Sequence, residues 1–191
     1  MKKIPNLHLQ YQQVMRRIIV LASLALAITA CNRTQDHEKN AKLFSFERTY
    51  YYPGTPDFVY DHLTGDITGW WDHSFSGHPY KMYIDPKPGG GFYEIFDESG
   101  DGILHATVTG AKRGKLLRME GPLGLAGIAV TFVTTYRLEP QGTDSTKLVL
   151  NVNAAGDVGN DIPDIVSKVW YHFLEERFRP YISGLTEKTV E

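Results

Sequence analysis

Apolar and polar residues alternate through much of the chain after residue 42, and this period of two predicts β-strands. The first run is rich in aromatic residues and covers 43–52. Six further runs, each closed by turn residues, cover 80–85, 92–98, 103–112, 115–121, 128–140 and 145–155. The links between these later runs are short, whereas parallel strands need long crossovers, so we expect an antiparallel meander.

Three segments carry helical patterns instead. The segment 55–65 opens with Thr-Pro-Asp, which supplies an N-cap hydroxyl, a proline at the first helical position and an acid in the first turn. Residues 66–71 are expected to form a second short helix. Residues 161–185 place apolar side chains at helical spacing on one broad face, and Pro180 is expected to kink or end this long helix locally.

The strands predict a sheet with one apolar face. In two of the runs the apolar positions are Val130, Phe132, Tyr136, Leu138, Leu148, Leu150 and Val152, while Thr, Asn and Arg occupy the other face. A sheet of this kind must cover its apolar face, and the long helix is the available cover. We therefore predict an α+β fold: a curved antiparallel sheet of about six or seven strands wrapped on a long C-terminal helix, with two short helices after strand one.

The N-terminal region has a different character. Arg16 and Arg17 precede an apolar run of 11 residues, 18–28, which has the length of a secretory h-region and is too short to span a bilayer. The run ends in Ile-Thr-Ala-Cys at Cys31, which resembles a bacterial lipobox. Two alternatives stay open: a secretory signal cut at an ordinary small-residue site, or a buried helix that ends in a chance cysteine.

This resemblance implies three parts: a signal peptide over 1–30, a lipidated Cys31 with a polar tether over 31–42, and a folded domain over 43–186. A start at Met15 would give a more compact signal peptide, so either Met1 or Met15 is the initiator. The asparagine after the cysteine favours the outer over the inner membrane, with the domain facing the periplasm.

Charge and cysteine count exclude other classes. After residue 30 the chain carries 16 basic and 22 acidic residues, a net charge of −6, which argues against a nucleic-acid partner. The single cysteine excludes an internal disulfide and a Cys-rich zinc site.

Several short motifs resemble the START-like or SRPBCC helix-grip superfamily over residues 44–185. They are Pro56–Leu63, Trp70-Trp71, Pro88–Phe92, Gly114–Leu117 and Trp170. The branches most similar are the Hsp-ATPase-activator-like and polyketide-cyclase-like proteins. The resemblance implies a hydrophobic cavity between sheet and helix that binds lipids, sterols, polyketides or other apolar ligands. The expected ligand-binding residues are Trp70, Trp71, Phe92, Glu94, Phe132, Tyr136, Trp170 and Phe173.

Glu94 is the best catalytic candidate. If Phe92 and Phe96 face the cavity, alternation places Glu94 on the same face, where burial would raise its pKa. The other register leaves Glu94 in water, and the pattern does not choose between them. Tyr136 falls on the inward set and its hydroxyl needs a partner.

Histidines give a weaker signal. Asp72, His73 and His78 lie in one loop, but no second cluster nearby in sequence completes a coordination sphere, so we interpret them as solvated and expect no metal. His105 lies opposite an apolar set of neighbours and is expected to be exposed. The glycine-rich turns lack phosphate-loop spacing, and we expect no cofactor.

The sequence therefore predicts a membrane-anchored, non-catalytic binding protein for a small hydrophobic ligand, lipid-like or aromatic. One alternative is a cyclase or dehydratase that uses Glu94 and Tyr136. A second is a protein-interaction module that resembles the chaperone ATPase activators. No protein partner is indicated.

Overall fold

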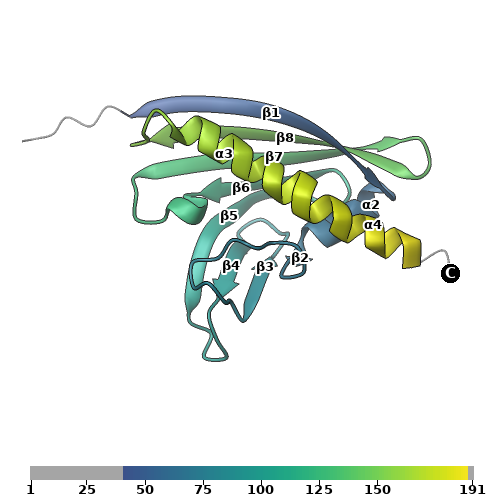
Figure 1. The fold of residues 1–191 in the computed structure, drawn as a ribbon, viewed down its shortest axis with the longest axis horizontal. Helices are drawn as coiled ribbons and strands as arrows, with labels where there is room; N and C mark the ends of the chain where they lie inside the picture. Colours follow the sequence, from purple (N-terminus) through teal and green to yellow (C-terminus); the bar gives the residue numbers. More distant parts are fainter. Residues whose placement is uncertain (1–40, 189–191) are drawn as a thin grey trace, which may run out of the picture. The chain divides into compact units, whose positions relative to one another are not determined.

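The computed structural model describes residues 41–188, which form one sheet and a long C-terminal helix (Figure 1). The strands are β1 (Lys42–Pro53), β2 (Gly65–Asp66), β3 (Lys81–Ile84), β4 (Gly91–Ile95), β5 (Gly102–Lys112), β6 (Leu116–Gly121), β7 (Val130–Gln141) and β8 (Ser145–Gly156). The predicted leader, Cys31 and most of the tether lie outside the described residues. Within the described part, no helix is long and apolar enough to cross a bilayer.

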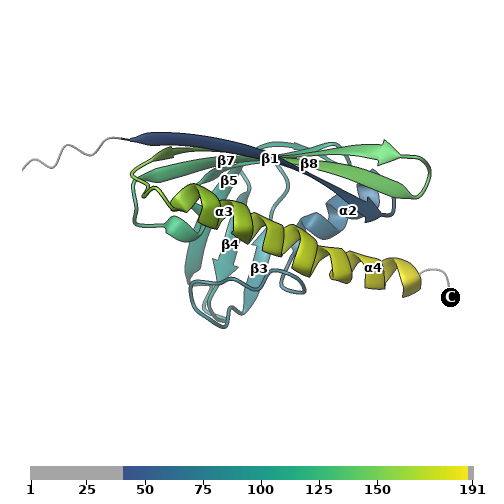
Figure 2. The ribbon, with the colours of Figure 1, turned by 45° about the horizontal axis from the view of Figure 1, so that its top comes forward.

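The sheet has the order β1-β8-β7-β6-β5-β4-β3-β2, and all pairs are antiparallel. Strands β3 to β8 form the predicted meander, the unpredicted β2 pairs with β3 at its edge, and β1 pairs with β8 along its whole length. The sheet curves around the C-terminal helix, which crosses one of its faces (Figures 1 and 2). The predicted fold class is confirmed, with eight strands in place of six or seven.

The C-terminal helix is built from α3 (Ile162–Tyr171), a π-helical segment (His172–Phe178) and α4 (Arg179–Lys188). Pro180 does not end it: the ribbon continues into α4 (Figure 1). A proline lacks an N–H group and crowds the carbonyl one turn before it. A π-helical segment, in which the backbone hydrogen bonds span five residues, directly precedes Arg179 and Pro180.

The start of helix α2 (Pro56–Leu63) is as predicted, since the Thr55 hydroxyl accepts a hydrogen bond from the Phe58 N–H at 3.3 Å. The second short helix is not formed. Residues 66–71 instead complete β2 and make a turn, because Ile67 N–H donates to the Met82 carbonyl at 3.0 Å. A single turn remains, in which the Trp70 and Trp71 N–H groups donate to the Ile67 carbonyl at 3.1 and 2.9 Å.

The core lies between the sheet and the helix. The inward residues predicted for β7 and β8 are buried, with Leu148, Leu150 and Val152 fully so. Around Phe178 the interior is filled by aromatic rings: Tyr52 packs edge-on at 5.0 Å and Trp70 at 4.9 Å between ring centroids. Beneath α3 the filling is incomplete, and a cavity results.

Candidate functional site

An apolar cavity of about 300 Å³ lies between α3 and the inner face of the sheet. Its walls come from the loop after Trp71, from β4, β5 and β7, from the loop that follows β6, and from the C-terminal helix. The lining residues are Trp71, His73, Ser74, Phe75, Phe92, His105, Pro122, Leu123, Gly124, Leu125, Phe132, Ile165, Val166, Val169, Trp170 and Phe173.

Five of the predicted ligand-binding residues are aromatic and line this cavity. They are Trp71, Phe92, Phe132, Trp170 and Phe173. Trp71 stacks on Phe173 with centroids 3.7 Å apart and meets Phe92 edge-on at 4.9 Å. This ring cluster joins the loop after β2, the sheet and the helix, so it forms a rigid wall.

Three predicted residues, Trp70, Tyr136 and Glu94, lie outside the lining. Trp70 is buried in the core, and its indole N–H donates to the His62 carbonyl at 3.1 Å. Tyr136 packs edge-on against Trp170 at 5.9 Å, and burial raises the pKa of its hydroxyl well above the ordinary value. The Trp70 and Tyr136 side chains support the cavity from behind.

Glu94 is completely buried and points inward, on the same face of β4 as Phe92. Of the two registers that the sequence left open, the inward one is therefore correct. It lies behind the cavity wall and is not part of the lining. Its carboxylate accepts hydrogen bonds from the Phe75 N–H, the Ser76 N–H and the Ser76 hydroxyl, each at 2.7 Å. Nε2 of His105 lies 3.0 Å from the same carboxylate.

These donors reverse the pKa shift expected for Glu94. Burial alone would raise the pKa of the carboxyl group, as the sequence analysis anticipated. The backbone hydrogen bonds from Phe75 and Ser76, together with the Ser76 hydroxyl and His105, outweigh burial and hold the pKa of Glu94 below its usual value. Glu94 is therefore an ionised anchor for the loop 72–80.

His105 is buried, and the expectation that it would be exposed is wrong. The pairing of β4 with β5 slips at this point: Phe92 pairs with Ala106 and Tyr93 with Leu104, which leaves His105 without a partner. Such a bulge puts two consecutive residues on one face, so His105 joins Ala106 inside and Leu104 is exposed. No period-two pattern reveals this.

His105 is one of the polar residues that line the cavity, with His73 and Ser74. Its Nδ1 lies 3.3 Å from the carbonyl oxygen of Leu123. Leu123 has a φ of 51°, a left-handed backbone conformation that costs energy for a residue with a branched side chain. The strained loop thus presents one carbonyl to His105 and two leucine side chains, Leu123 and Leu125, to the cavity.

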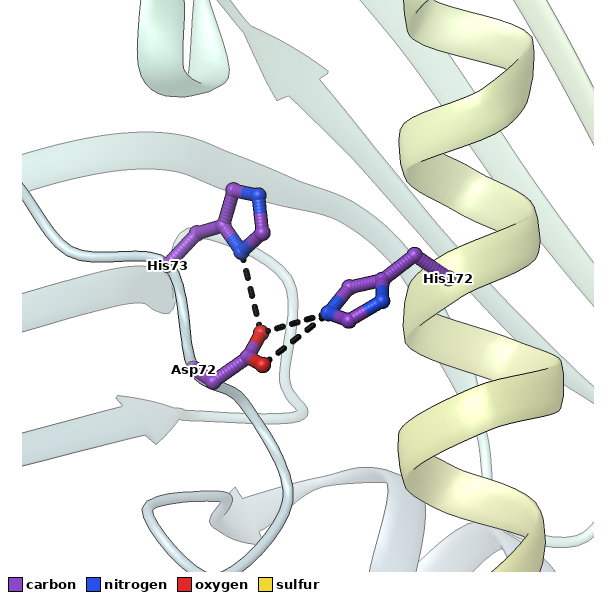
Figure 3. A group of neighbouring side chains, drawn as sticks. All are labelled: Asp72, His73 and His172. Carbon is purple, nitrogen blue, oxygen red and sulfur yellow. Dashed lines mark hydrogen bonds and ion pairs between the residues drawn. The ribbon is translucent and has the colours of Figure 1, made fainter.

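A second polar cluster lies at the rim, where the loop meets the helix (Figure 3). Asp72 Oδ1 is 2.9 Å from His73 Nδ1, and its Oδ2 is 2.9 Å from His172 Nε2. Hydrogen bonding from His73 and His172 overcomes burial and lowers the pKa of Asp72. Glu176, and then Asp72, raise the pKa of His172.

This cluster differs from the one considered in the sequence. His78 is exposed and is not a member of it. His172, which lies 100 residues after Asp72, takes its place. No group near the loop in sequence completes the cluster, and only the packing of the helix against that loop brings His172 there.

No protein-family model matches the chain, and no curated protein matches it significantly in sequence. Solved bacterial structures share the fold. A protein of unknown function from Staphylococcus aureus, SA2116, superposes with a TM-score of 0.55 at 14% identity, over 79% of this chain and 98% of that chain. The Mll3558 protein from Rhizobium loti gives 0.54 at 20% identity, over 71% and 95%.

CalU16 from Micromonospora echinospora superposes with a TM-score of 0.52 at 17% identity, over 78% of this chain and 86% of that chain. At these identities the likeness concerns the fold alone. The chain is thus an α+β protein with a curved antiparallel sheet and a long C-terminal helix, similar in fold to these bacterial proteins.

Proposed function

We propose that this protein is a membrane-anchored member of the START-like or SRPBCC superfamily that binds a small hydrophobic ligand in the cavity beneath α3. The observation that carries the proposal is the cavity itself. Its volume of about 300 Å³ lies at the lower end of the range of ligand pockets, ~300–1,000 Å³. Its lining is mainly aromatic and aliphatic, as such pockets require.

The distribution of polar groups suggests how a ligand would be oriented. His105 and Ser74 are polar lining residues, and Glu94 fixes the His105 ring from behind. The aromatic wall around Trp71 and Phe173 would bury the apolar body of the ligand. A molecule with an apolar body and one polar group suits this arrangement best.

The anchor is supported by the sequence alone. Arg16 and Arg17, the apolar run 18–28 and Cys31 have the order and spacing of a lipoprotein leader. An anchor on the periplasmic side, at the outer membrane in preference to the inner one, would keep the cavity beside a source of apolar molecules.

Binding is tested with the full chain and the neutral fluorescent probe N-phenyl-1-naphthylamine. Val169 lines the cavity, so Val169→Phe fills part of its volume and should weaken probe binding at least tenfold. Val133 lies on β7 next to Phe132 and does not line the cavity, so Val133→Phe is the matched control and should leave binding unchanged. Equal binding by wild type and Val169→Phe would contradict the proposal.

The natural ligand is sought by native mass spectrometry of the full chain followed by solvent extraction. An added mass that disappears in Val169→Phe and persists in Val133→Phe would identify the cavity as its location. Incorporation of labelled palmitate that persists after Cys31→Ala would overturn the anchor.

A second candidate function is catalysis, and one observation favours it: His105 faces the cavity and is paired with a buried carboxylate. Such a pair moves protons in many enzymes. Glu94 and Tyr136, the residues first considered for a cyclase or dehydratase, do not line the cavity, so His105 would be the group in contact with substrate. Conversion of the extracted ligand by wild type and its loss in His105→Gln would favour catalysis over binding.

A further inference from the structure

We propose that Asp72, His73 and His172 form a binding site for a divalent transition-metal ion of the Zn²⁺ type at the rim of the cavity. One ligand atom from each of these residues lies within 4.8 Å of the others. Two imidazoles and one carboxylate are the ligand types that zinc and its neighbours in the first transition row prefer.

The spacing of the donor atoms suits a metal ion. Asp72 Oδ1 is 2.9 Å from His73 Nδ1 and 3.0 Å from His172 Nε2. Ligands at about 2.1 Å from a tetrahedral Zn²⁺ are themselves about 3.4 Å apart, so the two donor pairs lie within about half an ångström of the spacing that an ion requires.

The hydrogen bonds around His172 supply the second argument. Glu176, one turn further along the helix, has Oε2 at 2.8 Å from His172 Nδ1. Nδ1 of His172 is held by Glu176, which leaves Nε2 as the nitrogen that faces Asp72 and would bind an ion. Glu176 is thus the outer partner that orients a metal-binding histidine.

Charge around the cluster permits a cation, with one competitor. Asp72 and Glu176 are acidic, while the guanidinium of Arg177 lies 3.1 Å from Asp72 Oδ2. Arg177 occupies one carboxylate oxygen and repels a metal ion. Removing the Arg177 side chain should therefore strengthen metal binding. If Asp72 served only as an ion-pair partner of Arg177, this substitution would give no such gain.

The position of the cluster links the site to the cavity. His73 also lines the cavity and packs edge-on against Phe173 at 4.8 Å, and its ring lies 5.2 Å from that of His172 (Figure 3). His172 is the first residue of the π-helical segment. A bound ion would tie the loop 72–80 to the helix at the edge of the cavity.

The test uses the full chain, stripped with a chelator and dialysed, and titrated calorimetrically with Zn²⁺ and separately with Mg²⁺. We expect one Zn²⁺ per chain and no comparable heat with Mg²⁺, which prefers oxygen ligands. His172→Ala and Asp72→Ala should each weaken Zn²⁺ binding at least 30-fold, and Glu176→Gln about 10-fold. Arg177→Gln should tighten it several-fold.

His78→Ala is the matched control, because His78 lies in the same loop and outside the cluster. It should bind Zn²⁺ like wild type, and His8 and His37 are present in every variant. Circular dichroism establishes that each variant is folded, and Zn²⁺ should raise the melting temperature of wild type and not that of His172→Ala. Equal Zn²⁺ binding by wild type and folded His172→Ala, or weaker binding in Arg177→Gln, would overturn the proposal.

Discussion

Replacing Glu94 with glutamine should destabilise the fold strongly. The carboxylate accepts three hydrogen bonds at 2.7 Å and a fourth from His105 at 3.0 Å, with no exposure to water. Glutamine keeps the volume but carries one oxygen acceptor and an NH₂ group, so at least one N–H of the loop would face another donor. Hydrogen bonds to charged groups contribute about 1.5–3 kcal/mol each, and a buried donor left unpaired costs about 1–3 kcal/mol. Because these effects overlap, we expect Glu94→Gln to lower the free energy of unfolding by about 2–4 kcal/mol.

Urea unfolding followed by far-UV circular dichroism and by tryptophan fluorescence measures this change. Glu98→Gln serves as control, because Glu98 is exposed on the turn after β4. It should change the free energy of unfolding by less than about 0.5 kcal/mol. A Glu94→Gln protein within 0.5 kcal/mol of wild type, on the scale of ordinary surface substitutions, would refute the view that this carboxylate anchors the loop.

Three further predictions follow from the same structure. The pKa of Glu94 is lowered in the fold, so its stabilisation is present above the unfolded value of 4.5 and is lost as the pH falls through the folded pKa. The stability difference between wild type and Glu94→Gln should therefore shrink below about pH 4.5, and a difference that grows toward acid would reverse the assigned sign. The Tyr52 hydroxyl donates a hydrogen bond to the Leu174 carbonyl in the π-helical segment at 2.9 Å. Tyr52→Phe should therefore lower the free energy of unfolding in urea by about 1 kcal/mol, whereas Tyr51→Phe, at an exposed position, should change it little. At the surface, the Arg113 guanidinium forms ion pairs with Asp57 and Asp61 of α2. Because exposed ion pairs contribute little, Arg113→Gln should leave the melting temperature within about 2 °C of wild type. A larger fall would show that these two pairs contribute more than exposed pairs do.

Local pattern alone was enough for the architecture. Alternation located all the long strands, and the short links between β3 and β8 required antiparallel pairing. The helical spacing after residue 161 identified the long helix that covers the sheet. These features depend on neighbours close in sequence, so they can be read without tertiary information.

The errors occurred where tertiary pairing overrides the local pattern. Residues 66–71 are predicted to be helical, but a hydrogen bond to the Met82 carbonyl holds Ile67 at the edge of the sheet. Pro180 is a helix breaker by itself, yet the helix continues through it, directly after a π-helical segment. For Ile67 the deciding contact is the Met82 carbonyl, a group that the local pattern does not contain.

The candidate site depends even more on the tertiary structure. By itself the sequence determined that aromatic residues such as Phe132 and Phe173 lie on inward faces, because their spacing matches the period of each element. Only the fold decided that His105 is inside, because a bulge in β5 displaces the alternation by one residue. Only the fold brought His172 to Asp72, because the helix packs on a loop 100 residues away. Periodicity determines which face a residue occupies, whereas a site requires specific groups from distant segments to meet, and that is set by packing.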